Sequence, residues 1–203
     1  MADDRTGARR VLVTGLSTYW GGRLASALES NPEIEAIIGV DSREPTRELT
    51  RTEYVKVGVE HRLIEKIVRA ARIDTVIDAR LMVDSLRGPD GLRPEQIHEN
   101  NVIGTLNILA ACAAGDSPVR KLVFKSSAHW YGCAQDDPAY FTEDMSRRYE
   151  PETRVERDVV EAESAVEEFR GQRPKVTVSV LRFANVLGAE VDTSHVQFFA
   201  LPA

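Results

Sequence analysis

The sequence predicts an α/β fold in which a doubly wound parallel sheet carries helices on both faces. Short apolar runs alternate along the chain with longer stretches whose apolar residues recur at helical spacing. That alternation is typical of strands joined by right-handed helical crossovers, which build a parallel sheet. A glycine turn directly after the first apolar run supports the same fold, because a strand that passes through such a turn into a helix begins a βαβ unit.

Six apolar runs are expected to form the strands, at residues 10–14, 34–40, 54–57, 74–79, 121–124 and 176–181. The first helix is expected to open at Gly21 and Gly22 and to end at Asn31 and Pro32, and further helices are expected at 63–71, 95–114 and 155–169. Loops are expected at 42–52 and 84–94, which contain proline and turn residues. The segment 132–150 shows no clear period.

Each predicted helix has an apolar stripe that should face the sheet. The stripes are Trp20, Leu24, Ala27 and Leu28; Leu63, Ile64, Ile67, Val68 and Ala71; Ile97, Val102, Ile103, Leu106, Leu109 and Ala113; and Val155, Val159, Ala162, Val166 and Phe169. The charged residues of 150–170 are interpreted as the solvated face of the last helix.

The stretch from the first strand through Gly15 and Gly21 indicates a dinucleotide site. A turn that leads into a helix start directs backbone N–H groups and the positive end of the helix dipole at one point, which suits a pyrophosphate. Asp41 lies 20 residues beyond Gly21, at the end of the second apolar run, where an acid can bind the adenosine ribose. Thr18 stands midway between the glycines, where a third glycine would allow the closest approach. Either the hydroxyls of Ser17 and Thr18 donate to the phosphates, or the turn is only a packed connection.

The length and composition limit the number of domains and the kinds of partner that the chain can have. The 203 residues are expected to form one domain at 10–203 after a flexible tail at 1–9. A net charge of −6 argues against a nucleic-acid or anionic-membrane surface, and no apolar run approaches the length of a membrane span. Cys112 and Cys133 have no metal-ligand spacing, so no metal site is predicted, and reduced thiols in a cytoplasm are expected. The apolar last residues, 197–203, suggest a chain cut off in the middle of a fold.

The motifs, taken in order, resemble the extended short-chain dehydrogenase/reductases, in the NAD-dependent epimerase/dehydratase branch typified by UDP-galactose 4-epimerase. The matching segments are 14–21, Asp41, 74–79, 101–105, 126–132 and 181–188. More narrowly, segments 124–127, 141–144 and 181–185 resemble a group of actinobacterial epimerase-like proteins of uncertain substrate. The resemblance implies a Rossmann-type domain that binds NAD, with the C-terminal substrate-binding part largely absent from this chain.

The resemblance also implies roles for individual residues. Ser127 would hydrogen-bond the reacting oxygen of the substrate, and Asn185 would meet the diphosphate of a nucleotide-sugar. For Ser127 the alternative is a plain strand-end cap, and for Asn101 it is a polar contact that stabilises its helix. The residues expected at the cofactor are Gly15, Thr18, Tyr19, Trp20, Gly21, Asp41, Ser42, Ala79 and Asn101.

The chain departs from the family at the catalytic pair, a tyrosine followed four residues later by a lysine. Arg157 in the lysine position places Thr153 in the tyrosine position, and Tyr149 has Thr153 four residues on, so no register gives the pair. His129 is the candidate substitute base, because its ordinary pKa is near 6.5. Lys125 and Tyr131 are also nearby in sequence. The other histidines, His61, His98 and His195, are expected at the surface or in loops.

Two functions from different classes follow from these observations. The first is an NAD-dependent epimerase/dehydratase-like oxidoreductase that acts on a nucleotide-sugar or a related small alcohol by hydride transfer. The second is a dinucleotide-binding sensor or scaffold that has lost the chemistry. NAD is expected to bind in preference to NADP, because a 2′-phosphate would lie against the Asp41 carboxylate, although Arg43 is close enough to reach such a phosphate. A homodimer is possible.

Overall fold

The computed structural model describes residues 9–58, 61–83, 93–132, 134–188, 191 and 193–200. The predicted tail at 1–9 apart from Arg9, the turn-rich loop at 84–92, Cys133 and residues 201–203 lie outside the described residues. The side chains of His61 and His195 also lie outside them.

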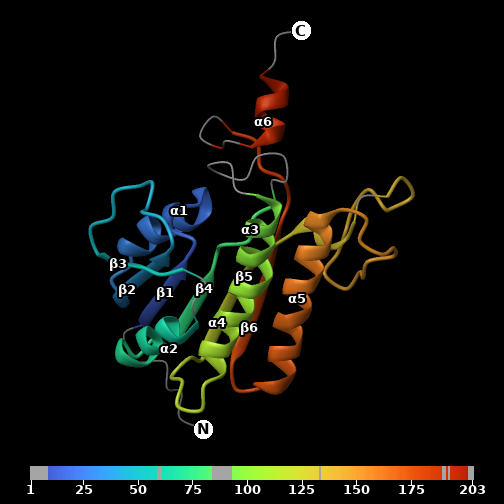
Figure 1. Ribbon diagram of the computed structural model, residues 1–203. Coiled ribbons are helices and arrows are strands. Elements are labelled where there is room, and N and C mark those ends of the chain that lie inside the picture. The colour runs from blue at the N-terminus through green and yellow to red at the C-terminus, as the bar shows by residue number, and fades with distance from the viewer. Residues whose placement is uncertain are drawn as a thin grey trace.

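Six parallel strands form one sheet in the order β3-β2-β1-β4-β5-β6, which confirms the predicted Rossmann-type fold (Figure 1). The strands are β1 (Arg9–Thr14), β2 (Ile34–Asp41), β3 (Thr52–Lys56), β4 (Thr75–Asp78), β5 (Lys121–Ser127) and β6 (Thr177–Phe183). The strand order reverses between β1 and β4. In open sheets of this kind, ligands bind beyond the carboxyl ends of the strands at that reversal.

Helices lie on both faces of the sheet, as the sequence predicts. They are α1 (Tyr19–Glu29), α2 (His61–Ala70), α3 (Pro94–His98), the π-helical segment η2 (Glu99–Ile103), α4 (Gly104–Ala113), the short 3₁₀ turn η3 (Ala128–Trp130), α5 (Arg154–Gln172) and α6 (Ser194–Phe199). One apolar cluster lies between the sheet and α2, α4 and α5, and a second lies between the sheet and α1. Alternation along β1 explains the division, because Leu12 belongs to the first cluster whereas Val11 and Val13 belong to the second.

Several predicted boundaries and faces are wrong. α1 begins at Tyr19 rather than Gly21, β3 begins at Thr52, and β6 continues to Phe183. The long helix expected at 95–114 begins at Pro94 and is interrupted by the π-helical turn η2. That turn shifts the angular position of the residues after it, so the expected stripe does not stay on one face. Ile103 and Leu106, which the stripe includes, are 41% and 43% exposed. Leu63 of α2 is also exposed.

The interpretation of residues 150–170 as a wholly solvated charged face is also wrong. The predicted apolar stripe of α5 is buried, but Glu156, Asp158 and Glu163 of the same helix are no more than 3% exposed. Each of these carboxylates accepts a hydrogen bond from another part of the fold, which offsets the loss of hydration. A charged residue near an apolar stripe can therefore face inward when a donor meets it.

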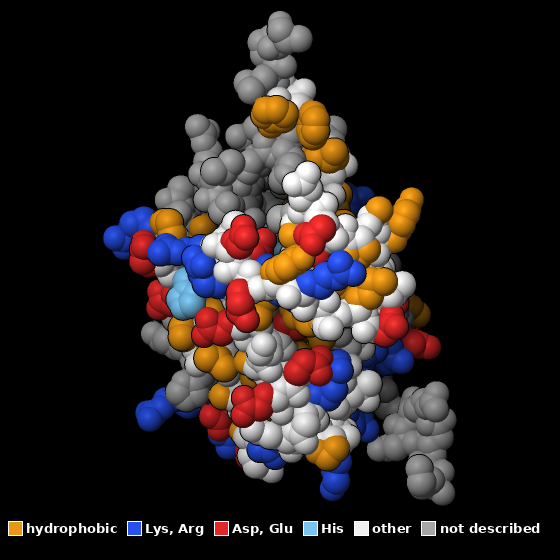
Figure 2. Space-filling view, turned by 90° about the vertical axis from the view of Figure 1, so that its right-hand side faces the viewer, with side chains coloured by type: hydrophobic (Ala, Val, Ile, Leu, Met, Phe, Trp, Pro, Cys, Tyr) orange, Lys and Arg blue, Asp and Glu red, His pale blue; other side chains and the backbone are white. Residues whose placement is uncertain are grey.

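At the C-terminal end, α6 extends away from the sheet (Figure 1). Phe198 and Phe199 of this helix are 69% and 68% exposed. Figure 2 shows hydrophobic side chains at this end of the molecule, whereas charges of both signs are interspersed over the body below.

Candidate functional site

The turn after β1 requires glycine at two positions. Gly15 has φ of +74°, a left-handed conformation, and a Cβ there would lie 2.9 Å from the Cα of Arg80. A Cβ at Gly21 would lie 2.0 Å from the carbonyl oxygen of Gly15, because the first turn of α1 packs directly on the turn. The two glycines thus bring the helix start and the strand end together.

Thr18 is the N-cap of α1, so the expectation that its hydroxyl donates to a phosphate is wrong. Its Oγ1 accepts from the Gly21 N–H at 3.0 Å and donates to the Gly15 carbonyl at 2.7 Å, so the turn already uses the hydroxyl hydrogen. The first amides of a helix have no partner within it, so the helix start offers an anion the N–H groups of Tyr19 and Trp20. The Ser17 Oγ accepts from Arg43 at 3.1 Å, and its hydroxyl has no acceptor among the residues that the structure describes.

Asp41, the last residue of β2, joins the second strand to the glycine turn. Its Oδ2 accepts from the Ser17 N–H at 2.8 Å and its Oδ1 from the Arg43 N–H at 3.1 Å. The carboxylate is therefore fixed at the edge of the sheet beside the turn.

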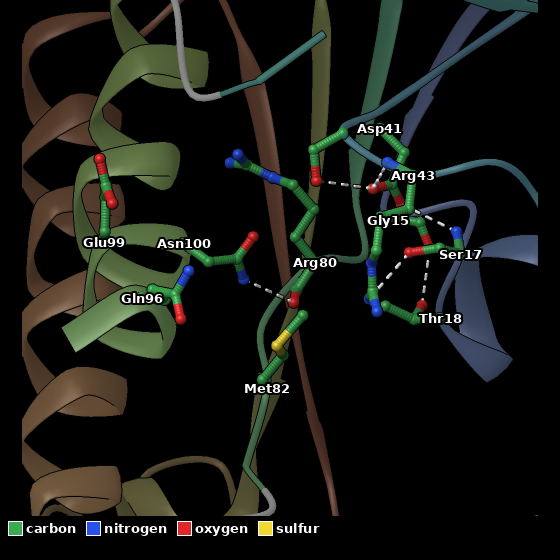
Figure 3. A pocket seen from close by; sticks show the side chains of 11 residues that line it. Gly15, Ser17, Thr18, Asp41, Arg43, Arg80, Met82, Gln96, Glu99 and Asn100 are labelled. Carbon is green, nitrogen blue, oxygen red and sulfur yellow. Dashed lines mark hydrogen bonds between the residues drawn. The ribbon is translucent and has the colours of Figure 1, made fainter. Parts of the chain in front are cut away.

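These groups line a cavity of about 180 Å³ at the reversal between β1 and β4 (Figure 3). The turn after β1, the end of β2, the segment after β4, and α3 with η2 all contribute to it. The lining residues are Gly15, Ser17, Thr18, Asp41, Ser42, Arg43, Arg80, Met82, Gln96, Glu99 and Asn100. The sequence assigned Gly15, Thr18, Asp41 and Ser42 to a cofactor site, and the structure places these four together.

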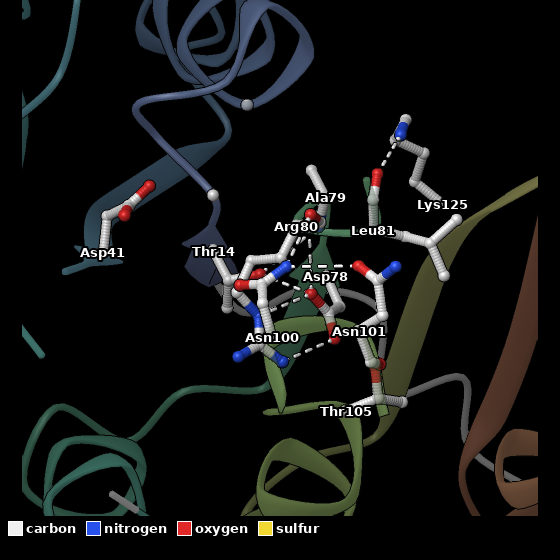
Figure 4. Close-up of polar contacts among 12 residues, drawn as sticks. Thr14, Asp41, Asp78, Ala79, Arg80, Leu81, Asn100, Asn101, Thr105 and Lys125 are labelled. Carbon is white, nitrogen blue, oxygen red and sulfur yellow. Dashed lines mark hydrogen bonds and ion pairs between the residues drawn. The ribbon is translucent and has the colours of Figure 1, made fainter. Parts of the chain in front are cut away.

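Arg80, which lines the cavity, forms a buried ion pair with Asp78 (Figure 4). Arg80 reaches both carboxylate oxygens, with Nε–Oδ1 and Nη2–Oδ2 each at 3.1 Å, and the Thr14 hydroxyl donates to Oδ1 at 2.6 Å. Burial alone would raise the pKa of Asp78, but the Arg80 guanidinium and these hydrogen bonds bring that pKa below its usual value. A Cβ at Gly104 would lie 2.4 Å from the Arg80 Nη1, so this glycine makes room for the guanidinium.

Arg80 is not among the residues that the sequence predicts for the site. The available signal was the short spacing Asp78-Ala79-Arg80 at the end of a buried strand. An acid and a base at such a strand end are expected to pair, because an unpaired charge there would be costly.

Asn101 holds the segment that follows β4. Its side-chain amide accepts from the Met82 N–H at 2.9 Å and donates to the Met82 carbonyl at 2.8 Å. The residue is buried, and its Nδ2 donates to Oδ2 of Asp158 at 3.4 Å. The other oxygen of Asp158, Oδ1, lies 2.7 Å from Nδ1 of His98. His98 lies on α3 with 45% of its side chain exposed, as expected of a surface residue, and its ring also bonds to this buried acid.

Ser127 and His129 lie in contact at the carboxyl end of β5. The Ser127 Oγ is 2.7 Å from the His129 Nδ1 and also accepts from the His129 N–H at 3.3 Å. With the ring proton on Nε2, the hydroxyl donates to Nδ1. The second contact is a cap of η3, so the capping role and a role at the substrate are both compatible with this geometry.

Two arginines hold the η3 turn that carries His129. Arg147 donates to the His129 carbonyl at 2.9 Å and to buried Glu156 at 2.6 Å. Arg182 of β6 lies 3.6 Å from the centre of the Trp130 ring and donates to the Tyr131 hydroxyl at 2.8 Å. Glu163 of α5 pairs with Arg182, so both buried glutamates of α5 brace this turn through an arginine.

The start of α5 contains no tyrosine–lysine pair. Thr153 is the N-cap of the helix, with its hydroxyl accepting from the Glu156 N–H at 3.2 Å. Arg157 donates to the carbonyls of Pro151 and Glu152, at 3.4 and 3.0 Å. Both residues at the two family positions therefore serve the helix start.

The remaining predicted residues are not part of the cavity lining. Trp20 packs on Phe183 with ring centres 5.1 Å apart, and Tyr19 meets the edge of Trp20. Ala79 is buried beside Gly15, and Asn185 is exposed beyond β6. The roles expected of these residues at a cofactor or substrate stay predictions.

The model of the NAD dependent epimerase/dehydratase family matches residues 11–200. The chain belongs to this family. The cofactor of the family is NAD, in agreement with the sequence prediction. The glycine turn, the helix start and the Asp41 carboxylate fit such a dinucleotide, because they offer N–H donors to the pyrophosphate and an acceptor to a ribose hydroxyl.

An uncharacterized protein of Mycobacterium tuberculosis is 33% identical over 196 residues, which cover 95% of this chain and 51% of that protein. A UDP-glucose 4-epimerase of Azospirillum brasilense is 28% identical over 142 residues, covering 68% of this chain and 39% of the epimerase. The crystal structure of a UDP-glucose 4-epimerase with UDP-glucose from Thermotoga maritima matches with a TM-score of 0.72 at 22% identity, over 90% of this chain and 58% of that one. The chain thus spans about half the length of the curated mycobacterial relative.

Two further features bear on the site. Among the described ranges, no three or more His, Cys, Asp and Glu side chains are grouped so that they could hold a metal ion. Within the same part of the chain, no helix combines the length and apolar character needed to cross a membrane.

Proposed function

We propose that the chain is the cofactor-binding part of an NAD-dependent oxidoreductase that acts on a nucleotide-sugar as an epimerase or dehydratase. The observation that carries this proposal is the cavity at the strand-order reversal, where the Gly15 turn and the Asp41 carboxylate meet. The UDP-glucose in the Thermotoga maritima epimerase supports a nucleotide-sugar as the substrate class.

When bound, NAD supplies a hydride acceptor that can also return the hydride. Side chains of this protein would accept the proton that the substrate hydroxyl loses when the carbon bearing that hydroxyl is oxidised. Ser127 is placed to hydrogen-bond that hydroxyl, and His129, at 2.7 Å from Ser127, is placed to accept the proton through it. Arg147 and Arg182 would keep the pair in position through the η3 turn and the residues that follow it.

A second candidate function is a dinucleotide-binding sensor or scaffold without catalysis. It is favoured by the use of Thr153 and Arg157 at the start of α5, where neither residue can replace a tyrosine–lysine pair. Both functions require the same cofactor site, so the two are separated only by turnover.

The cofactor site is tested by calorimetry with NAD and NADP. NAD should bind more tightly, and Asp41→Ala should weaken its binding without lowering the melting temperature substantially. Glu48→Ala is the matched control, because Glu48 is an exposed acid of the loop that follows Asp41 and is not in the cavity lining. Tighter binding of NADP, or equal binding of NAD by wild type and Asp41→Ala, would contradict the assignment.

The activity is tested by incubating the chain with NAD and UDP-, GDP- and dTDP-sugars while NADH absorbance and epimeric products are followed. Turnover that falls in Ser127→Ala and His129→Ala would support the oxidoreductase. NAD binding without turnover on any of these sugars would favour the sensor or scaffold. Turnover that survives both substitutions would show that the proton-handling groups lie elsewhere.

A further inference from the structure

Lys125 is a half-buried amine that the proposed proton transfer does not use. It lies on β5, and its Nζ donates to the Leu81 carbonyl at 2.8 Å (Figure 4). Within the described residues, that carbonyl is its only hydrogen-bond partner, so two of the three ammonium hydrogens have no acceptor among them.

The strand register places this amine at the ligand-binding edge of the sheet. Asp78 of β4 is paired with Phe124 of β5, and Leu81 and Ser127 each follow that pair by three residues. Because β4 ends at Asp78, the Lys125 amine reaches a carbonyl that lies beyond the carboxyl end of that strand. Side chains two residues apart on a strand point to the same face, so Lys125 and Ser127 share a face of the sheet.

The carbonyl that holds Lys125 belongs to a fixed segment. Asn101 binds both backbone groups of Met82, the residue after Leu81, at 2.9 and 2.8 Å. The Asp78–Arg80 pair lies directly before Leu81, and Asp78 is largely neutralised by its own arginine. The amine is therefore held by a rigid backbone and not by a carboxylate of its own.

We propose that Lys125 supplies the cationic group that α5 does not contribute to the reaction site. Its ammonium is directed at the reacting oxygen of an alcohol substrate beside the nicotinamide end of NAD. This role rests on the proposed function. The ammonium stabilises negative charge on the oxygen as the hydroxyl proton passes to the Ser127–His129 pair, and Lys125 itself keeps its protons.

The electrostatics of the position agree with this role. Burial lowers the pKa of Lys125 to about 8, against the opposing effect of the Asp78 carboxylate. The amine is thus still charged at neutral pH, and it is a stronger hydrogen-bond donor than an ordinary lysine.

The first test uses the unaltered protein and needs no turnover. Lysines are acetylated with and without NAD and UDP-glucose, and each site is quantified by peptide mass spectrometry. At ligand concentrations ten times the Kd, labelling of Lys125 should slow about tenfold, because only the free protein reacts. Lys121 is the internal control: it lies on the same strand and face but is exposed at the opposite end. Equal labelling of Lys125 with and without the ligands overturns the proposal.

The second test compares Lys125→Gln with Lys121→Gln. Glutamine can still donate to the Leu81 carbonyl but carries no charge. Lys125→Gln should lower kcat about 100-fold with little change in the Kd of NAD, within the range usual for acid–base and charge contributions. Lys121→Gln should match wild type. Wild-type kcat in Lys125→Gln overturns the proposal, whereas absence of turnover in the wild-type chain counts against the oxidoreductase function and leaves the labelling result to decide on Lys125.

Discussion

Removing one partner of the buried pair formed by Glu163 and Arg182 is expected to destabilise the fold strongly. The Glu163 carboxylate is 1% exposed, and the side chain of Arg182 is 19% exposed. One oxygen of Glu163 accepts from Arg182 Nε at 2.9 Å and also from its Nη2, and the other accepts from the Ser126 hydroxyl at 2.6 Å. Removing the carboxylate would leave a largely covered guanidinium and a buried hydroxyl without their acceptor.

The size of the effect follows from this geometry. Breaking a buried ion pair from one side costs about 3–5 kcal/mol. Arg182 would keep its contacts with Trp130 and Tyr131, so we expect Glu163→Ala to lose about 3 kcal/mol of unfolding free energy, at the low end of that range. Glu163→Gln keeps the shape and one acceptor, so we expect a loss of about 1.5 kcal/mol, as for a hydrogen bond to a charged group.

The assay is urea unfolding followed by circular dichroism, with Glu167→Ala as the control. Glu167 lies one turn further along α5 and pairs with Arg170 at 3.0 Å, but its side chain is 48% exposed. Exposed pairs of this kind contribute about 0–1 kcal/mol. If Glu163→Ala cost no more than Glu167→Ala, the buried pair would not be the support of the η3 turn that the contacts indicate.

Two further predictions concern the glycine turn after β1 and the stability of the fold at acid pH. Gly21→Ala should destabilise the protein by more than about 3 kcal/mol, above the usual cost of overpacking, because the new Cβ meets backbone at 2.0 Å; Gly171→Ala, in open space on α5, should be neutral or stabilising in the same thermal melts. Burial would raise the pKa of Glu29, but hydrogen bonds from Arg51, Thr50 and Thr52 lower it from 4.5 to about 2. The stabilising effect of the Glu29 carboxylate should be present above pH 4.5 and lost as the pH falls toward 2. Glu29→Gln should therefore reduce the fall in unfolding free energy between pH 4.5 and pH 2. An unchanged fall in that range would contradict the lowered pKa of Glu29.

Much of the fold could be predicted from the sequence because the burial pattern is regular. A strand buried on both faces appears as a continuous apolar run, and a helix packed on one face shows a stripe, so the order of elements and the parallel sheet follow. The errors lie where regularity fails. The π-helical turn before Gly104 moves Ile103 and Leu106 off the expected face, and no spacing rule marks such a turn in advance.

The cofactor side of the site was also largely predictable, since Gly15 and Asp41 are tied to strand ends. A strand end fixes a residue's position in a parallel sheet, whatever its side chain contacts. Arg80 could not be placed in the same way, because its position in the cavity depends on its pairing with Asp78 and on the room that Gly104 leaves, 24 residues further along the chain. The roles of Asn101, Ser127 and Asn185 toward a ligand stay predictions.

The start of α5 shows why the chemistry of this site could not be predicted by position alone. In the family, this helix supplies the acid–base pair, but here Thr153 caps the helix and Glu156 and Glu163 turn inward to hold two arginines. Those arginines fix the segment after β5, which carries His129 and adjoins Ser127 and Lys125. The helix therefore acts on the proposed reaction groups through the turn that it supports, and not by contributing a group of its own. Glu163→Gln, which should spare the fold but loosen the turn, should accordingly lower turnover without weakening NAD binding. Calorimetry measures the binding of NAD, and the sugar-nucleotide assay measures turnover. Weakened NAD binding with unchanged kcat would contradict this arrangement.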